Sequence, residues 1–164
     1  MPKENFDVIS LTNSDGCFDL QFRKDTRHER TNSPTYYRWK AQFIITNPAS
    51  NVKILEKIKN KLICGSVTLS GPQARFSVQK ISDISEIVVP FFRKNCLEGK
   101  KKKDFELWAK GVEIIQKNRG KQLSLWKKNE LGTLIEIHKS SAKYKNRPRQ
   151  SKWFEIAKSI SKTS

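Results

Sequence analysis

The chain has 164 residues, and 33 lysines and arginines against 16 acidic residues give it a formal net charge of +17 at pH 7. A folded chain with that charge repels itself, which favours a polyanionic partner, with nucleic acid as the first candidate. No run of 18 apolar residues is present, and the start lacks the layout of a secretory signal, so we expect no membrane partner. The three cysteines, Cys17, Cys64 and Cys96, form no CxxC pair, which argues against a disulfide framework or a zinc ribbon.

Hydrophobic periodicity predicts a helix and two strands at the start of the chain. The apolar stretch 6–14 predicts a short helix, which Asp15-Gly16 ends because glycine supplies the backbone freedom of a helix stop. Strict alternation of apolar and polar residues then predicts half-buried strands over 17–24 and 36–46. The polar residues 25–34 are expected to form the loop between them.

The rest of the chain predicts a second hairpin among helices. Asn47-Pro48 is expected to break the second strand, and Ser50 and Ser82 are expected to cap helices. The later elements, in chain order, are a helix over 51–62, strands over 65–69 and 75–80, a helix from 82 through 91, a polar elbow (NCLEGKKKK), a helix from 104 and a helix over 121–138. We expect one domain over 1–138 and a basic C-terminal extension over 139–164 that ends in a docked helix.

This order, α-β-β-α-β-β-α with extra C-terminal helices, predicts an α+β fold. The two hairpins can pair into one antiparallel sheet whose apolar face is covered by helices. The other face is expected to be open, polar and cationic, lined by Gln21, Arg23, Arg38, Lys40, Gln42, Arg75 and Gln79. Such a face fits a duplex groove, where glutamine reads adenine edges and arginine reads guanine. The alternative is a plain solvated sheet face, and the net charge favours the groove.

Residues 8–16 read VISLTNSDG, are followed by CF, and resemble a degenerate LAGLIDADG motif of the homing endonucleases. Leu11, Asp15 and Gly16 match the motif. FIITN at 43–47, PFF…LEGKKKKDFELW and KNELGTLIEIHKSSAKY resemble later parts of the family, so the resemblance covers nearly the whole chain. It implies the αββαββα fold with a saddle-shaped antiparallel sheet.

The resemblance also implies a function, that of a site-specific endonuclease that cuts both strands of a long pseudo-palindromic DNA site. Asp15, with the Ser14 carbonyl nearby, would hold Mg²⁺ or another divalent metal ion beside the scissile phosphate. Asn47 matches the position that helps to order active-site water. Lys101, or the neighbouring Lys100, matches the elbow lysine that stabilises transition-state charge.

Since the chain contains one motif, the resemblance implies a homodimer in which a second chain supplies the second motif helix. The residues expected at this interface are Val8, Ile9, Leu11 and Thr12. The residues expected to contact DNA are Asp19, Gln21, Arg23, Arg38, Lys40, Gln42, Ile44, Arg75, Ser77 and Gln79. An intron-encoded protein made inside an organelle, a mitochondrion or chloroplast, fits the lack of a visible targeting signal.

Two alternatives remain open from the residues alone. Without the resemblance, Asp15-Gly16 is an ordinary helix-ending turn, and the four lysines of the elbow are a solvated surface. The rival function is a non-catalytic RNA-binding relative, such as an intron maturase or a ribosome-associated protein. Asn13 and Ser10, which replace the first acid and the glycine of the motif, favour the rival, as does the high lysine content. Asp15, Asn47 and the elbow lysine favour the enzyme.

Overall fold

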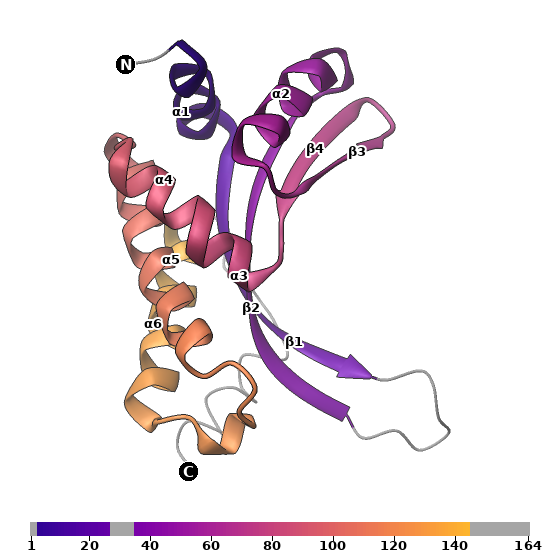
Figure 1. The fold of residues 1–164 in the computed structure, drawn as a ribbon. Coiled ribbons are helices and arrows are strands. Elements are labelled where there is room, and N and C mark those ends of the chain that lie inside the picture. Colours follow the sequence, from indigo (N-terminus) through magenta and orange to yellow (C-terminus); the bar gives the residue numbers. More distant parts are fainter. Residues whose placement is uncertain (1–2, 27–34, 145–164) are drawn as a thin grey trace. The chain divides into compact units, whose positions relative to one another are not determined.

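The computed structural model describes residues 3–26 and 35–144, so most of the predicted loop and residues 145–164 of the predicted extension lie outside the described residues. The described chain is α+β in the predicted order (Figure 1). Its elements are α1 (Lys3–Asp15), β1 (Gly16–Thr26), β2 (Thr35–Pro48), η1 (Ala49–Asn51), α2 (Val52–Leu62), β3 (Ser66–Ser70), β4 (Gln73–Val78), α3 (Ile81–Asp83), the π-helical η2 (Ile84–Val88), α4 (Val89–Lys94), α5 (Gly99–Lys117), η3 (Leu123–Leu125) and α6 (Lys128–Tyr144).

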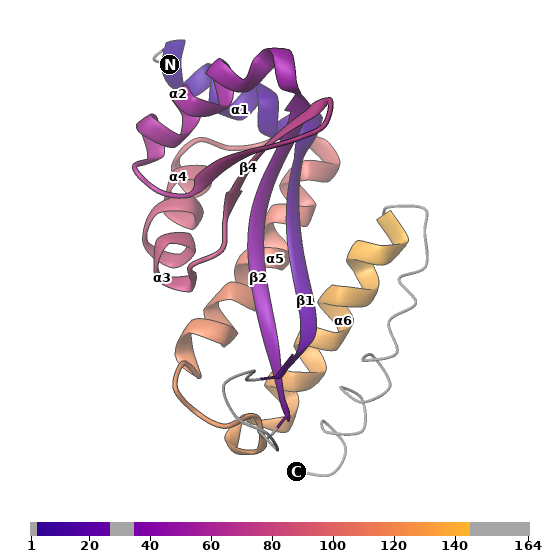
Figure 2. The ribbon, with the colours of Figure 1, turned by 90° about the vertical axis from the view of Figure 1, so that its right-hand side faces the viewer.

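The four strands form one sheet in the order β1-β2-β4-β3 (Figure 2), so the two predicted hairpins do pair. β4 runs antiparallel to both of its neighbours. Arg75 lies opposite Thr46 of β2 and Thr68 of β3, which fixes three side chains in one row on one face. The next residue of β4, Phe76, faces the other way and is fully buried.

The chain packs as two compact units, and β1 and β2 each pass from one unit to the other. The first unit comprises Met1–Asp19 and Ala41–Glu113, and the second comprises Leu20–Lys40 and Ile114–Ser164. Helix α6 continues through position 138, where sequence analysis placed a domain boundary. Among the described residues, no helix combines the length and the apolar character that crossing a membrane requires.

Aromatic side chains form the core of the first unit. Phe18 of β1 stacks on Phe43 of β2 with ring centroids 5.2 Å apart, and it also contacts Phe92, Phe105 and Trp108. The Trp108 indole donates a hydrogen bond of 2.9 Å to the carbonyl of the residue that follows Phe18. Aromatic pairs of this kind add to the energy of area burial, so this cluster holds α4 and α5 on the sheet.

The second unit has its own core, built on the other parts of β1 and β2. Phe22 contacts Tyr37 and Trp39, and Trp39 contacts the ring of His138 on α6. His138 is buried, and its Nδ1 lies 2.9 Å from the carbonyl oxygen of Leu20. This buried polar contact ties α6 to β1.

Three predicted element boundaries are wrong. β2 ends at Pro48, within the predicted break but two residues beyond the predicted strand end at 46, because β4 pairs with it as far as that residue. Ser50 lies in η1, and the residue before α2 is Asn51, which makes no side-chain cap. Ser82 lies inside a helix that starts one residue earlier.

The predicted elbow also differs, because α5 begins at Gly99 and places Lys100 to Lys103 in helix. The helix predicted from position 121 is instead η3 followed by α6 from Lys128. Residues 139–144, predicted as the start of a basic extension, are the last part of α6.

Candidate active site and nucleic-acid face

The carboxylate of Asp15 is exposed at the last residue of α1, where the chain turns directly into β1. This abrupt turn requires glycine at position 16, because a Cβ there would lie 2.6 Å from the backbone oxygen of Thr12. Thr12 itself is fully buried, and its hydroxyl donates a 2.7 Å hydrogen bond to the carbonyl of Val8. The end of α1 is therefore fixed by close packing, and Asp15 is held at a defined place.

Two side chains orient the Asp15 carboxylate. Its Oδ2 accepts a 3.0 Å hydrogen bond from Nδ2 of Asn47 and a 3.1 Å hydrogen bond from the Ser14 hydroxyl. Asn47 is only 7% exposed, and its Oδ1 accepts a 2.8 Å hydrogen bond from Nδ2 of Asn51. Because Asn51 donates to the oxygen of Asn47, the Asn47 amide presents its NH₂ group to the carboxylate. Among the described residues, Oδ1 of Asp15 accepts no hydrogen bond, which leaves it available to a ligand.

Lys101 comes to this site from α5. Its ammonium group donates a hydrogen bond to the carbonyl oxygen of Gly16, the residue after Asp15. Lys100 is exposed on the same helical turn. Nearby, the backbone N–H of Glu98 donates a 3.1 Å hydrogen bond to Oδ1 of Asn13, so the residue that replaces the first acid of the motif ties α1 to the start of α5.

The donor set contains a single carboxylate. In the part of the chain that the structure describes, no three His, Cys, Asp or Glu side chains gather closely enough to hold a metal ion by themselves. Mg²⁺ in phosphoryl-transfer sites commonly takes only one or two carboxylates, with water and phosphate oxygens as its other ligands. Asp15, whose Oδ1 accepts no hydrogen bond from the described residues, fits that pattern.

The face of the sheet predicted to bind nucleic acid is polar on β4. Gln73 and Arg75 are exposed, Ser77 is half-buried, and the alternate residues Ala74, Phe76 and Val78 are buried, as the sequence alternation predicts. Gln79 is also exposed, directly after the strand ends. In the second unit, Arg23 and Arg38 are exposed, and Gln21 and Lys40 are half-buried.

Three residues predicted on this open face are buried instead. Asp19 is 4% exposed, Gln42 is 8% exposed, and Nε2 of Gln42 donates a 3.2 Å hydrogen bond to a carboxylate oxygen of Asp19. Ile44 is 8% exposed. The alternation placed these side chains on the correct strands, but neighbouring side chains cover them. With these exposed fractions, the three side chains have little surface with which to contact a base.

Most of the predicted dimer interface is also buried within one chain. Val8, Ile9 and Thr12 are 1%, 8% and 0% exposed, so they pack against their own unit and are not available to a second copy. Leu11 is half-buried. The exposed positions of the described part of the motif helix are Ser10, Ser14 and Asp15.

Sequence reasoning missed two groups of residues. Ser66 and Thr68 of β3 lie opposite Ser77 and Arg75, so they extend the polar face. The alternation of polar and apolar residues in SVTLS, at 66–70, could have predicted their place on this face. The second group is Asn51, whose bond to Asn47 joins a short helix to a strand end, for which no sequence pattern exists.

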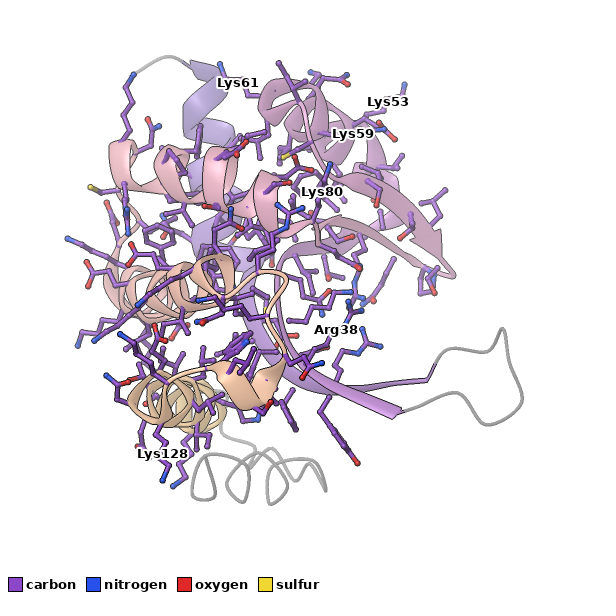
Figure 3. The ribbon with its side chains drawn as sticks, turned by 60° about the horizontal axis from the view of Figure 1, so that its bottom comes forward. Arg38, Lys53, Lys59, Lys61, Lys80 and Lys128 are labelled. Carbon is purple, nitrogen blue, oxygen red and sulfur yellow. The ribbon has the colours of Figure 1, made fainter. Side chains whose placement is uncertain are left out.

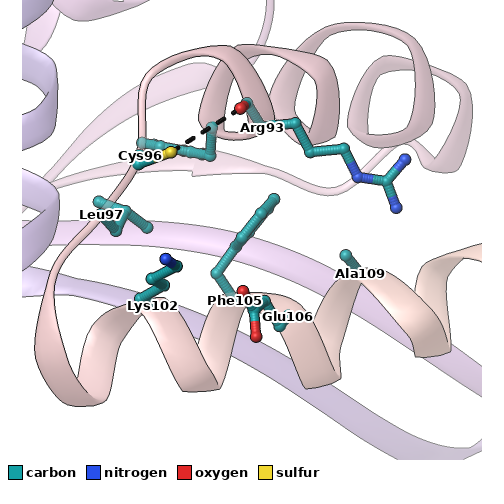
Figure 4. Close-up of a pocket in the computed structure, with 8 residues that line it drawn as sticks. Arg93, Cys96, Leu97, Lys102, Phe105, Glu106 and Ala109 are labelled. Atoms are coloured by element: carbon teal, nitrogen blue, oxygen red, sulfur yellow. Dashed lines mark hydrogen bonds between the residues drawn. The ribbon is translucent and has the colours of Figure 1, made fainter.

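A separate cavity of about 330 Å³ lies between α4 and α5 (Figure 4). It is lined by Phe92, Arg93, Cys96, Leu97, Lys102, Phe105, Glu106 and Ala109, none of which was predicted as a site residue. The Arg93 guanidinium is paired with Glu113 at 2.7 Å.

A carboxylate at the end of the first helix of an αββαββα unit, with a lysine from a later helix beside it, is the arrangement that the resemblance to the homing endonucleases implies. The family model for LAGLIDADG endonucleases matches residues 10–112. The chain belongs to the LAGLIDADG endonuclease family.

Two curated fungal relatives share part of the sequence. The chain is 28% identical over 102 residues to "Probable intron-encoded DNA endonuclease 1" of Mycosarcoma maydis. The aligned region covers 62% of this chain and 34% of that protein. It is 32% identical over 114 residues to "Probable intron-encoded endonuclease 3" of Neurospora crassa, which covers 68% of this chain and 20% of that protein. The chain thus spans about a third and a fifth of the length of these relatives.

Solved structures establish the fold. The homing endonuclease I-TnaI is 19% identical, with a TM-score of 0.68 over 98% of this chain and 97% of its own. I-SmaMI, bound to uncleaved DNA target in the presence of calcium ions, is 19% identical, with a TM-score of 0.73 over 93% of this chain and 48% of its own.

Proposed function

We propose that this protein is a site-specific endonuclease that cuts both strands of duplex DNA by metal-dependent phosphodiester hydrolysis. The observation that carries the proposal is the convergence of Asp15, Asn47 and Lys101 from α1, β2 and α5, three elements far apart in sequence. An exposed carboxylate, a carboxamide and an ammonium group at one point are the groups that a phosphodiester hydrolase needs to hold metal, order water and stabilise negative charge.

We propose Asp15 and the Ser14 carbonyl as the ligands of Mg²⁺ or another divalent ion. Such an ion, when bound, supplies a positive charge that polarises a phosphate oxygen. The structure of I-SmaMI bound to uncleaved DNA target in the presence of calcium ions supports a role for a divalent ion. The hydrogen bonds from Asn47 and Ser14 occupy Oδ2 of Asp15, and they keep Oδ1 directed away from those two residues.

The remaining catalytic roles follow from charge and position. Asn47, held by Asn51, fixes the carboxylate and can orient water beside it. The Lys101 ammonium group bonds to the carbonyl oxygen of Gly16, the residue after Asp15, and is proposed to place a cation where negative charge develops on a phosphate. Lys100 is exposed on the same turn and is proposed to contact an adjacent phosphate.

The polar face of the sheet is proposed to bind the DNA. Arg75, Ser77 and Gln79 in the first unit combine positive charge with side chains that can read base edges. Gln21, Arg23, Arg38 and Lys40 are proposed for the same role in the second unit. Asp19, Gln42 and Ile44 would contact DNA only if the side chains that cover them move.

A second copy of the chain is proposed to supply the second motif helix, which makes the target pseudo-palindromic. Because Val8, Ile9 and Thr12 are buried, we assign the contact between copies to the face that carries Ser10 and Ser14, whose small side chains permit close approach of two helices. The intron-encoded relatives favour an intron-encoded gene, and the organellar location stays a prediction.

A cleavage selection tests the proposed function. Wild type, Asp15→Asn and a matched control, Glu86→Gln, are incubated with a randomised duplex library in Mg²⁺ and in Ca²⁺. Glu86 is an exposed acid on η2, so its loss removes one charge away from the site. We expect defined double-strand cuts in Mg²⁺ by wild type and the control and none by Asp15→Asn. Binding without cuts by wild type would contradict the nuclease, and preferential binding of RNA would favour the non-catalytic rival.

A further inference from the structure

We propose that the outer face of α2 is a second DNA-binding surface, which holds the backbone of a duplex segment other than the one on the sheet. Three lysines, Lys53, Lys57 and Lys61, define this surface, and we call them the lysine row. They recur every four residues, and all three are exposed. At a rise of about 1.5 Å per residue, the row is about 12 Å long. Lys59 lies on the flank of the same helix, and Figure 3 shows Lys53, Lys59 and Lys61 projecting from α2.

The packing of α2 fixes the direction of the row. Leu55, Ile58 and Leu62 are 0%, 2% and 5% exposed and form the apolar face of the helix. This helix contacts β3 and β4. With 100° between successive residues, the mean direction of the lysine row lies about 130° around the helix from the mean direction of those three residues. The row therefore points away from the sheet.

The lysine row and the polar sheet face lie on opposite sides of one layer. Within β4, Phe76 is buried under the helix side of the sheet, and Arg75 is exposed on the other side. A straight duplex against Arg75 cannot reach Lys57 through the sheet. Binding at both faces therefore needs two duplex segments.

The charge pattern of α2 differs from that of an ordinary solvated helix. Along the outer face of α5, Lys103, Glu106, Lys110, Glu113 and Lys117 alternate in sign and are exposed. The single acid of α2, Glu56, is exposed and forms no ion pair with any residue that the structure describes. Like charges four residues apart destabilise a helix. A polyanion laid along the row would remove that repulsion.

The residue types favour a duplex backbone over a single strand. α2 has no aromatic residue, and sequence-tolerant binding of single strands relies on bases stacked on aromatic side chains. Lysine ammonium groups bind phosphates as point charges without reading sequence. Binding at the row is therefore independent of sequence, unlike binding at the sheet face.

Salt dependence of binding tests the proposal. The row variant Lys53→Gln/Lys57→Gln/Lys61→Gln is compared with a control that loses the same charge elsewhere, Lys110→Gln/Lys127→Gln/Lys128→Gln. The probe is a labelled 24-bp mixed-sequence duplex without metal, so that no cleavage takes place. The logarithm of the association constant falls linearly with the logarithm of the salt concentration, and loss of three phosphate contacts makes this slope shallower by about 2.7. Between 50 and 200 mM salt, the affinity of wild type is therefore expected to fall about 40-fold more than the affinity of the row variant. A smaller change is expected for the control.

The number of duplexes bound per protomer shows whether the lysine row binds a second duplex segment or adds contacts to the duplex on the sheet. By sedimentation, wild type is expected to bind one more duplex per protomer than the row variant. The variant Lys53→Arg/Lys57→Arg/Lys61→Arg keeps the charge and is expected to bind as wild type does, which controls for folding. Equal slopes for row variant and control, equal stoichiometry, or preference for an RNA duplex of the same sequence would overturn the proposal. None of these readouts depends on Asp15, so failure here is distinct from failure of the proposed nuclease.

Discussion

The hydrogen-bond chain from Asn51 through Asn47 to Asp15 predicts an energetic coupling that a double-mutant cycle can measure. Asn51→Ala removes the 2.8 Å donor to Oδ1 of Asn47, an amide that is 7% exposed. An unsatisfied buried acceptor costs about 1–3 kcal/mol, and water reaches part of this site, so we expect a loss of about 1–2 kcal/mol in the free energy of unfolding. Asn47→Ala also removes the bond to the carboxylate, and we expect a loss of about 2–3 kcal/mol.

The double variant decides whether the two residues act as one unit. Once Asn47 is absent, Asn51 has no amide to hold, so the double variant is expected to lose no more than Asn47→Ala alone. The coupling energy is then about 1–2 kcal/mol, within the range for residues in direct contact. Urea unfolding in metal-free buffer measures it. Asn60→Ala, on the exposed face of α2, is the control and is expected to change stability by no more than about 0.5 kcal/mol.

The same perturbation has a catalytic consequence under the proposed function. Without Asn51, the Asn47 amide is free to turn its oxygen toward the carboxylate. Loss of about 1.4 kcal/mol of orientation at Asp15 corresponds to a tenfold slower single-turnover cleavage. Asn51→Asp, which cannot donate, is expected to be slower still. If the stability effects of the two substitutions were additive, with a coupling energy below about 0.3 kcal/mol, the hydrogen-bond chain from Asn51 to Asp15 would be refuted. This conclusion would hold for any measured cleavage rates.

Three further predictions follow from exposure, backbone conformation and burial. Ile63 follows the last residue of α2 with a φ of 57° and is 84% exposed, and a β-branched residue in that conformation costs about 1–2 kcal/mol. Ile63→Gly is therefore expected to raise the free energy of unfolding by about 1 kcal/mol. A lower free energy of unfolding, measured in urea, would contradict this prediction. Ser10→Lys places like charges across the proposed contact between copies, so light scattering is expected to show a monomer at concentrations where wild type is a dimer; an unchanged dimer would move the interface elsewhere. Burial raises the pKa of the Cys64 thiol from 9.0 to about 11, so iodoacetamide at pH 8.5 is expected to label Cys64 more slowly than the exposed Cys96, as mass spectrometry can show. Because the folded state holds this proton more tightly, its contribution to stability is complete below about pH 9 and is lost as pH rises through about 11.

The sequence by itself determined the elements whose patterns are local. The alternation around Phe18 and Phe76 gave the strands, the spacing of three and four residues between Leu55, Ile58 and Leu62 gave the buried face of α2, and the Asp15-Gly16 pair gave the end of the first helix. These outcomes follow from periods of two and 3.6 residues, which depend only on near neighbours.

Tertiary structure decided which of these faces stay open and which side chains meet. Asp19 and Gln42 alternate as surface residues do, yet they bond to each other and are buried. Asn47 and Asn51 come together through the turn after β2, and Lys101 reaches Gly16 across 85 positions of sequence. Periodicity assigns a side chain to a face, but only the packing of distant elements determines whether that face is covered and what it contacts.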